Sequence, residues 1–372
     1  MKKFLVVLAL VAFAASAMAA DWGLYGSMRF ATFYVNVDKD YVKASNQNHQ
    51  NYPDNKSYTD LGVFGLQGNS RLGANIKVND KLTGKIELAI SNDTKESGYV
   101  TKTGVNLRLY YGQYDFGAFK LRIGQDYTPT DVAASGYFDQ VISDDNDLAG
   151  FGAYYESRKE QVKFIFPFGL EFALVKNAQT DTKKYDVTTP RFEASYAVKA
   201  GMVNGKVFGA YQTYSAETES ATIFDTSSYV VGAAAKVKAG MVGVSATGFY
   251  GSNLKAVGPA DTGKVLVAPK KDEDTTDYGF ALAVFANPAD NMKVEVGYGY
   301  QASDNDGMKQ KNDAQSYYVN LKYTVAKGFF IQPEIAVIDY MENDGGKKDD
   351  TAVKVVKEGK ATYFGAKWQM DF

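Results

Sequence analysis

The sequence contains no cysteine and only one histidine, His49. Without cysteine, the chain has no disulfide scaffold, no thiolate-bound metal and no CxxCH haem attachment. A lone histidine without a partner constellation argues against histidine-based metal sites and against a serine hydrolase triad. We therefore expect no catalytic residue, no metal site and no cofactor, and we interpret the protein as a non-enzyme.

Long hydrophobic runs are also scarce, because only Phe4–Ala14 forms one. That run is shorter than the roughly 20 residues that a membrane-spanning helix needs. It follows Lys2-Lys3 and precedes overlapping small-x-small cleavage sites in residues 15–20, which is the pattern of a cleaved export signal. We expect residues 1–20 to be a signal peptide and residues 21–372 to form one exported domain.

The chain has no excess of positive charge either. Its formal net charge is −2, with 41 basic and 43 acidic residues, so it lacks the basic footprint of a nucleic-acid-binding protein. Glycine, tyrosine and phenylalanine are abundant, at 35, 27 and 23 residues, whereas proline occurs 8 times. Aromatic residues are enriched in β-strands and proline is depleted there, so this composition favours an exported β protein.

The last twelve residues alternate in polarity with the period of a β-strand. One face carries Phe364, Ala366, Trp368, Met370 and Phe372, and the other carries Gly365, Lys367, Gln369 and Asp371. An apolar outer face, a polar inner face and a terminal aromatic residue are typical of an outer-membrane β-barrel. This ending also resembles the signal read by the barrel-assembly machinery, which we expect to be a partner.

Alternating segments of about 9 to 13 residues continue along the chain, as tilted membrane-spanning strands require. We predict sixteen strands, at 23–36, 65–78, 82–90, 103–114, 119–125, 150–157, 162–175, 189–199, 206–214, 229–237, 242–251, 278–286, 292–301, 315–323, 329–339 and 361–372. Seven short turns alternate with eight long loops between them, and a soluble sandwich gives no reason for that alternation. The sequence therefore predicts an all-β fold, a closed 16-stranded antiparallel transmembrane barrel with short periplasmic turns.

The positions of two tryptophans and two prolines give checks on the predicted barrel. Trp22 begins the first predicted strand and Trp368 lies near the end of the last, and closure pairs these strands. We expect both rings, together with Phe372, in the aromatic girdle of one membrane rim. Pro167 and Pro333 lie inside predicted strands and cannot donate to a ladder, so each should mark a bulge or a misplaced boundary.

Arginine is rare, and four of the six, Arg29, Arg71, Arg108 and Arg122, fall on the polar face of early predicted strands. An arginine facing lipid costs about 2–4 kcal/mol at the membrane midplane, so we expect these four and Lys120 to line the pore. The third long loop is acidic, with Asp126, Asp131, Asp139, Asp144, Asp145 and Asp147. If it folds inward, opposite charges face one another at a constriction. The alternative is that the aspartates are solvated at the mouth and the arginines are ordinary wall residues.

Acidic clusters at 144–147, 271–274 and 304–307 offer oxygen ligands of the kind that Ca²⁺ prefers. None has the twelve-residue spacing of an EF-hand. We interpret these clusters as solvated loop tips. We also expect His49, in the first long loop, to be solvated.

Several segments of the chain carry recognisable motifs. They are Tyr25-Gly-Ser-Met-Arg29, Gly68-Asn-Ser-Arg-Leu-Gly73, the stretch 109–129 with its Phe-Gly turn and Tyr-Thr-Pro ending, and Tyr154-Tyr-Glu-Ser157. These segments resemble the general trimeric porins of Gram-negative bacteria. The resemblance implies a sixteen-stranded barrel, a homotrimer, and a long third loop folded into the lumen. The chain departs from the family pattern in Gln125 and Asp126, where an arginine is common, and it lacks the Pro-Glu-Phe-Gly-Gly loop motif of enteric members. The detailed charge of the constriction is therefore not carried over from the resemblance.

These patterns predict an outer-membrane porin of a Gram-negative bacterium, a water-filled channel for passive diffusion of ions and small hydrophilic solutes. Its expected surroundings are outer-membrane lipid and lipopolysaccharide. Two alternatives stay open. A channel dedicated to sugars or organic anions would be favoured by an aromatic track through Tyr110, Tyr114, Tyr127 and Tyr137. The second alternative is a barrel that serves as a shell around a periplasmic partner.

Overall fold

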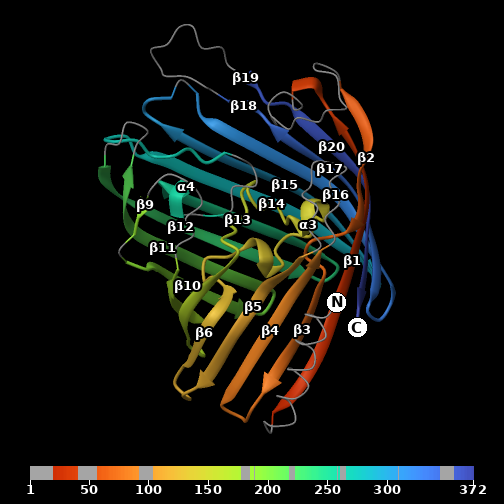
Figure 1. Ribbon diagram of the computed structural model, residues 1–372. Coiled ribbons are helices and arrows are strands. Elements are labelled where there is room, and N and C mark those ends of the chain that lie inside the picture. The colour runs from red at the N-terminus through yellow and green to blue at the C-terminus, as the bar shows by residue number, and fades with distance from the viewer. Residues whose placement is uncertain are drawn as a thin grey trace.

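The structure is a computed structural model that describes residues 20–40, 57–91, 104–176, 185–187, 189–217, 223–257, 259, 265–308, 310–343 and 356–372. Its main feature is one antiparallel sheet that closes into a barrel (Figure 1). His49 and the predicted signal peptide, apart from Ala20, lie outside the described residues. Within the described part of the chain, no helix is long and apolar enough to cross a membrane.

Eighteen strand segments build the barrel wall. They are β1 (Asp21–Val37), β2 (Tyr58–Leu66), β3 (Arg71–Lys77), β4 (Leu82–Ser91), β5 (Gly104–Asp115), β6 (Lys120–Tyr127), β7 (Arg158–Ile165), β8 (Leu170–Val175), β9 (Tyr185–Asp186), β10 (Arg191–Ala200), β11 (Val203–Glu217), β12 (Ile223–Ala239), β13 (Val242–Ser252), β14 (Thr275–Ala289), β15 (Met292–Asn305), β16 (Asn312–Ala326), β17 (Phe329–Tyr340) and β20 (Lys360–Asp371). The short β18 (Glu342–Asn343) and β19 (Val356–Lys357) form a separate hairpin.

These segments make sixteen wall strands in the described residues. β2 and β3 both pair with β1 and are two parts of one strand, and β9 and β10 both pair with β11 in the same way. β1 closes the barrel against β20, from Ser27 opposite Asp371 to Val37 opposite Ala361. The predicted architecture and strand number are confirmed.

Short turns and longer connections alternate around the barrel. The short turns comprise 78–81, 116–119, 166–169, 201–202, 240–241, 290–291 and 327–328. The strand ends that lead into the longer connections lie at the opposite end of the wall (Figure 1).

Two predicted strands are wrong, and the two errors cancel in the count. Residues 150–157 are not a strand, because Gly150, Gly152 and Ser157 have φ values of +75°, +100° and +69°, which an extended strand does not allow. The segment 162–175 is not one strand but the hairpin of β7 and β8. Pro167 lies in the turn of that hairpin, where no ladder hydrogen bond is required of it.

Side chains alternate between the two faces of the wall with period 2. On β15, Val296 is 55% exposed, whereas its neighbour Glu295 is 0% exposed. On β20, Trp368 is 37% exposed and Lys367 is 4% exposed. The outer face is therefore apolar and the inner face polar, as a barrel in lipid requires.

The expectation that Trp22 and Trp368 share one rim is wrong. Trp368 aligns with Phe30, whereas Trp22 aligns with Ile76, eight residues earlier on β1. Eight residues span about 26 Å along a strand. The prediction assumed flush strand ends, but neighbouring strands of a tilted barrel are staggered, and β1 begins well before its first partner on β20.

Pro333 does lie inside a wall strand, with its neighbourhood partly unpaired. On the β16 side, the aligned pairs stop at Asn320–Glu334 and resume at Tyr323–Ile331 in the same register. The expected bulge is therefore absent there. Proline has no N–H to donate, and the β16–β17 ladder has no aligned pairs over the short stretch that contains Pro333.

Candidate functional site

The connection between β6 and β7, residues 128–157 and called L3 here, is folded into the barrel (Figure 1). It contains η2 (Ala133–Ser135) and α3 (Ile142–Asp145). Phe138, Ile142 and Phe151 of L3 are each 1% exposed, in one buried cluster with inward-facing Phe208 and Phe249 of the wall. These wall residues interrupt the polar inner face on this side, and L3 covers them because apolar side chains are costly to expose to water.

Buried ion pairs fix the base of L3 to β10. Arg191 lies 2.6 Å from Glu156 and 3.4 Å from Glu193, and all three residues are 1% exposed. Thr130, at the start of L3, donates its hydroxyl to Glu193 at 2.8 Å. Tyr154, near its end, accepts a hydrogen bond from Arg191 at 2.9 Å. Both ends of the loop are therefore held at one point of the wall.

Glycines allow L3 to lie directly against β14 and β15. A Cβ on Gly152, which has φ +100°, would lie 2.0 Å from the carbonyl oxygen of Phe280 on β14. A Cβ on Gly299 of β15 would lie 1.9 Å from the carbonyl oxygen of Phe151. The two backbones are thus in contact, with no room for a side chain between them.

We expect Gly299→Ala to push residues 151–152 off the wall and to loosen L3, because backbone atoms on both sides resist the added methyl group. Proteinase K cleavage within L3 of the folded, detergent-solubilised protein measures this loosening. Gly112→Ala on β5 is the matched control, since a Cβ there meets nothing within 4 Å. Equal protease resistance in the two variants would contradict the prediction.

The tip of L3 is fixed to the far wall through its backbone. Glu334 on β17 accepts hydrogen bonds from the N–H groups of Val141 and Ile142, at 3.0 and 3.1 Å. Glu295 on β15 accepts one from the N–H of Asp139 at 2.7 Å. L3 therefore spans the lumen from β10 to β15 and β17, and it is anchored both at its base and at its tip.

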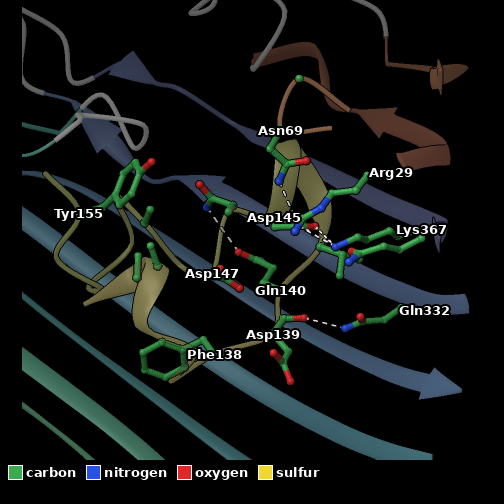
Figure 2. A pocket seen from close by; sticks show the side chains of 18 of the residues that line it. Arg29, Asn69, Phe138, Asp139, Gln140, Asp145, Asp147, Tyr155, Gln332 and Lys367 are labelled. Atoms are coloured by element: carbon green, nitrogen blue, oxygen red, sulfur yellow. Dashed lines mark hydrogen bonds and ion pairs between the residues drawn. The ribbon is translucent and has the colours of Figure 1, made fainter. Parts of the chain in front are cut away.

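Asp145, at the end of α3, joins L3 to the first and last wall strands (Figure 2). It forms an ion pair with Arg29 on β1, and it accepts hydrogen bonds from Lys367 at 2.6 and 2.7 Å and from Asn69 at 3.0 Å. Burial raises the pKa of this carboxyl, but Lys367 and then Arg29 outweigh burial and hold the pKa below its usual range. Asp145 therefore stays ionised, and its contribution to L3 docking is lost only in strong acid, as the pH falls through that lowered pKa.

Further arginines gather beside L3. Arg108 lies 2.7 Å from Glu87, and Arg71 lies 3.6 Å from the same carboxylate. The hydroxyl oxygen of Tyr127 accepts hydrogen bonds from Arg108 at 3.1 Å and from Arg158 at 3.2 Å. Two guanidinium groups thus share one carboxylate and two share one phenol oxygen, so their positive charge is only partly compensated.

A cavity of about 510 Å³ lies between L3 and these residues. Its charged lining in the described residues consists of Arg29, Arg71, Arg108, Arg158, Lys322 and Lys367 against Asp139, Asp145 and Asp147. Six cations and three carboxylates leave a formal excess of three positive charges when all are ionised. The cavity is therefore suited to attracting anions.

Some predicted constriction residues do not line this cavity. Arg122 pairs with Asp126, which belongs to β6 rather than to the loop and also binds Lys163 at 2.8 Å. Lys120 lies next to a short turn, 3.8 Å from Asp115. Strand period assigns a residue to a face of the wall, but it does not give its height along the barrel axis.

The acidic residues of L3 differ in their surroundings. Asp139 is ion-paired with Lys293 on β15, and Asp145 meets Arg29 in direct contact rather than across an open gap. Asp131 is 2% exposed, and burial raises its pKa to about 7 against the attraction of Lys206. The side chain of Asp144 lies outside the described residues. Among the residues that are described, no group of three or more His, Cys, Asp and Glu side chains is placed to hold a metal ion.

Asp147 lies at the cavity beside Asp139 and Asp145 (Figure 2). Burial and repulsion from these two carboxylates raise its pKa well above the usual aspartate value. We expect Asp147 to take up a proton as the pH falls through this raised pKa, which adds net positive charge and strengthens anion preference. Reversal potentials across a pH series measure the effect. Asp147→Asn should keep the reversal potential at the value that the parental channel reaches at acid pH. If the reversal potential of this variant still depends on pH, Asp147 is not the group that titrates.

Sequence reasoning misses three cations of the cavity. Lys367 falls on the polar face of the last predicted strand, which is the one available signal. Arg158 sits in a predicted turn that is in fact the start of β7. Lys322 comes from β16, which only barrel closure brings near β1.

A closed barrel with an apolar outer wall, a polar inner wall and an inward-folded loop defines an outer-membrane channel of the porin type. The chain matches the family model described as Gram-negative porin over residues 6–346. It belongs to the Gram-negative porin family, and it forms a water-filled channel for passive diffusion across the outer membrane. No curated protein sequence matches it.

Solved structures share the fold at low sequence identity. The outer membrane channel DcaP of Acinetobacter baumannii is similar at 17% identity and a TM-score of 0.69, covering 96% of this chain and 99% of that chain. The anion-selective porin from Comamonas acidovorans is similar at 14% identity and a TM-score of 0.62, and the match covers 95% of this chain and 100% of that chain. The trimer form of OmpT from Vibrio cholerae is similar at 16% identity and a TM-score of 0.60, and the match also covers 95% of this chain and 100% of that chain. The family and these neighbours imply a non-enzymatic channel.

Proposed function

We propose that the cations lining the cavity form the constriction of this channel and give it a weak preference for anions. The observation that carries the proposal is the surplus of cations: Arg29 and Lys367 share Asp145, and Arg71 and Arg108 share Glu87. Fixed charge at a narrow point sets ion preference. The reversal potential of a planar bilayer in a KCl gradient should have the sign of anion preference. The opposite sign would overturn the proposal.

General diffusion is favoured over a channel dedicated to one substrate class. Of the four tyrosines that suggested an aromatic track, Tyr110 and Tyr114 are 61% and 39% exposed on the outer face of β5, and Tyr137 is buried in L3. Tyr127 does line the cavity. We also propose that the protein has no enzymatic activity of its own.

We further propose a homotrimer in outer-membrane lipid and lipopolysaccharide, inserted by the barrel-assembly machinery after cleavage of residues 1–20. The first strands present apolar outer residues for contact between walls, such as Leu24 and Leu72, which are 79% and 39% exposed. Native mass measurement in mild detergent tests the assembly. A monomer that still conducts would overturn the trimer and leave the channel intact.

A further inference from the structure

The connection between β13 and β14, residues 253–274, is called L6 here and is described at 253–257, 259 and 265–274. These described residues turn into the barrel mouth. Asn253 has a left-handed backbone, φ +57°, which redirects the chain directly after β13. Leu254, the first residue of α4 (Leu254–Val257), is 0% exposed. α4 lies against β12.

Two inward-facing wall residues hold both arms of L6. Asp277 on β14 accepts a hydrogen bond from the N–H of Leu254 at 3.0 Å, and Ser303 on β15 accepts one from the N–H of Val267 at 3.0 Å. Ser303 in turn donates its hydroxyl to Asp277 at 2.5 Å. The outgoing and returning arms of the loop are therefore tied to the same pair of side chains.

Asn253 adds a second attachment. Its side-chain N–H group donates to the carbonyl oxygen of Ser227 at 2.9 Å and to Asp274 at 2.7 Å, and its side-chain oxygen accepts the N–H of Thr275 at 2.8 Å. Asn253 is 1% exposed. Because both ends of this amide are bonded to neighbouring segments, the first turn of L6 has a fixed orientation.

The inner wall beneath L6 is shut off from solvent. Asp277 and Ser303 are 0% exposed, and the neighbouring inward residue Gln301 is 1% exposed. A water-filled mouth would hydrate such polar side chains. Val265 and Leu266 of L6, at 0% and 4% exposure, instead pack into the buried cluster that also contains L3.

The two inward loops therefore fill one side of the lumen. Phe249 and Ala281, on the wall strands that flank L6, are 6% and 2% exposed. On the arginine-lined side, the side chains of Arg29 and Arg71 remain 15% and 18% exposed. The accessible path thus runs past the arginines.

We propose that L6 is a second fixed constriction element, which limits the size of the solutes that enter, whereas the arginine-lined cavity selects their charge. The proposal adds to the diffusion function of the channel and does not depend on the anion preference. Its readout is an uncharged solute, so the two proposals fail independently.

The test compares three variants in proteoliposome swelling with a series of uncharged sugars of increasing size. Asp277→Ala removes the acceptor for Leu254 and Ser303. A second variant replaces residues 255–266 by a short glycine linker and keeps the anchors. Because open cross-section sets permeation, we expect uptake of the largest admitted sugar to rise roughly twofold or more in both. Asp225→Ala on β12 is the matched control, because Asp225 is an exposed aspartate that bonds Ser215.

A tether checks that the loop itself causes the change. The chain has no cysteine, so Val267→Cys with Ser303→Cys places the one engineered disulfide across the anchor. Oxidised, this variant should keep the parental size limit, and reduction should raise it. Heat-modifiable migration in electrophoresis verifies that each barrel is folded. Unchanged sugar uptake in a folded linker variant would overturn the proposal, as would a raised size limit in the oxidised tether.

Discussion

Replacing Arg71, Arg108 and Arg158 together by glutamine is expected to reverse the ion preference of the channel. The substitutions leave Arg29, Lys322 and Lys367 as cavity cations against three carboxylates, and they free Glu87 from both of its arginine partners. When all groups including Asp147 are ionised, the local balance then changes from a positive excess to a negative one, and a pore with acidic lining favours cations. The reversal potential in a salt gradient should change sign.

Arg122→Gln is the matched control for this experiment. Arg122 is also an inward arginine of an early strand, but it pairs with Asp126 away from the cavity lining. Its removal should leave the reversal potential close to the parental value. If the triple variant keeps anion preference, or if Arg122→Gln alone abolishes it, the constriction lies elsewhere in the lumen.

Arg191→Leu is expected to cause the largest loss of stability of any single substitution considered. Arg191 lies between Glu156 and Glu193, and removing it leaves Glu193 without its cation and leaves Glu156 with Lys159 alone, at 3.2 Å. Breaking a buried pair in this way costs about 3–5 kcal/mol, because the group left behind is desolvated and has lost its partner. The base of L3 should detach from β10. Urea unfolding in detergent and protease cleavage within L3 measure the two effects.

An exposed ion pair of the same length provides the comparison. Lys176 and Glu160 also lie 2.6 Å apart, but their side chains are 66% and 58% exposed. Lys176→Met should change stability by less than about 1 kcal/mol, since water screens the pair and solvates the group left behind. Equal losses from Arg191→Leu and Lys176→Met would show that burial of the Arg191 cluster has no energetic consequence.

The fold was predictable where a residue's place depends on its strand neighbours alone. Period 2 placed Lys367 inside and Trp368 outside, because lipid accepts one kind of side chain and water the other. The same rule failed at 150–157, where glycines with positive φ break the strand although its residues alternate acceptably. At Pro167 the expected misplaced boundary is confirmed, because the proline lies in the hairpin turn between β7 and β8.

The candidate site was predictable only in part, for a related reason. Arg29, Arg71 and Arg108 were found from the face on which they lie, and Asp145 from the charge of its loop. The pairing of Asp145 with Lys367 joins residues 222 positions apart, and no local pattern contains that information. Glu334 was missed as an anchor of L3 because its partners are backbone N–H groups, which every sequence offers at every position except proline.

The seam between β1 and β20 sets the order in which this molecule can be made. The hydroxyl of Thr32 bonds the carbonyl oxygen of Ala366 across 334 residues, so the first strand to leave the ribosome pairs with the last. Until residues 360–371 arrive, β1 and β17 are open edges, ready to pair with any other chain. Closure of so long a loop is slow, because its entropic cost comes before any contact compensates for it. An incomplete chain therefore cannot close the barrel, and its two open edges stay available to other chains until β20 is present.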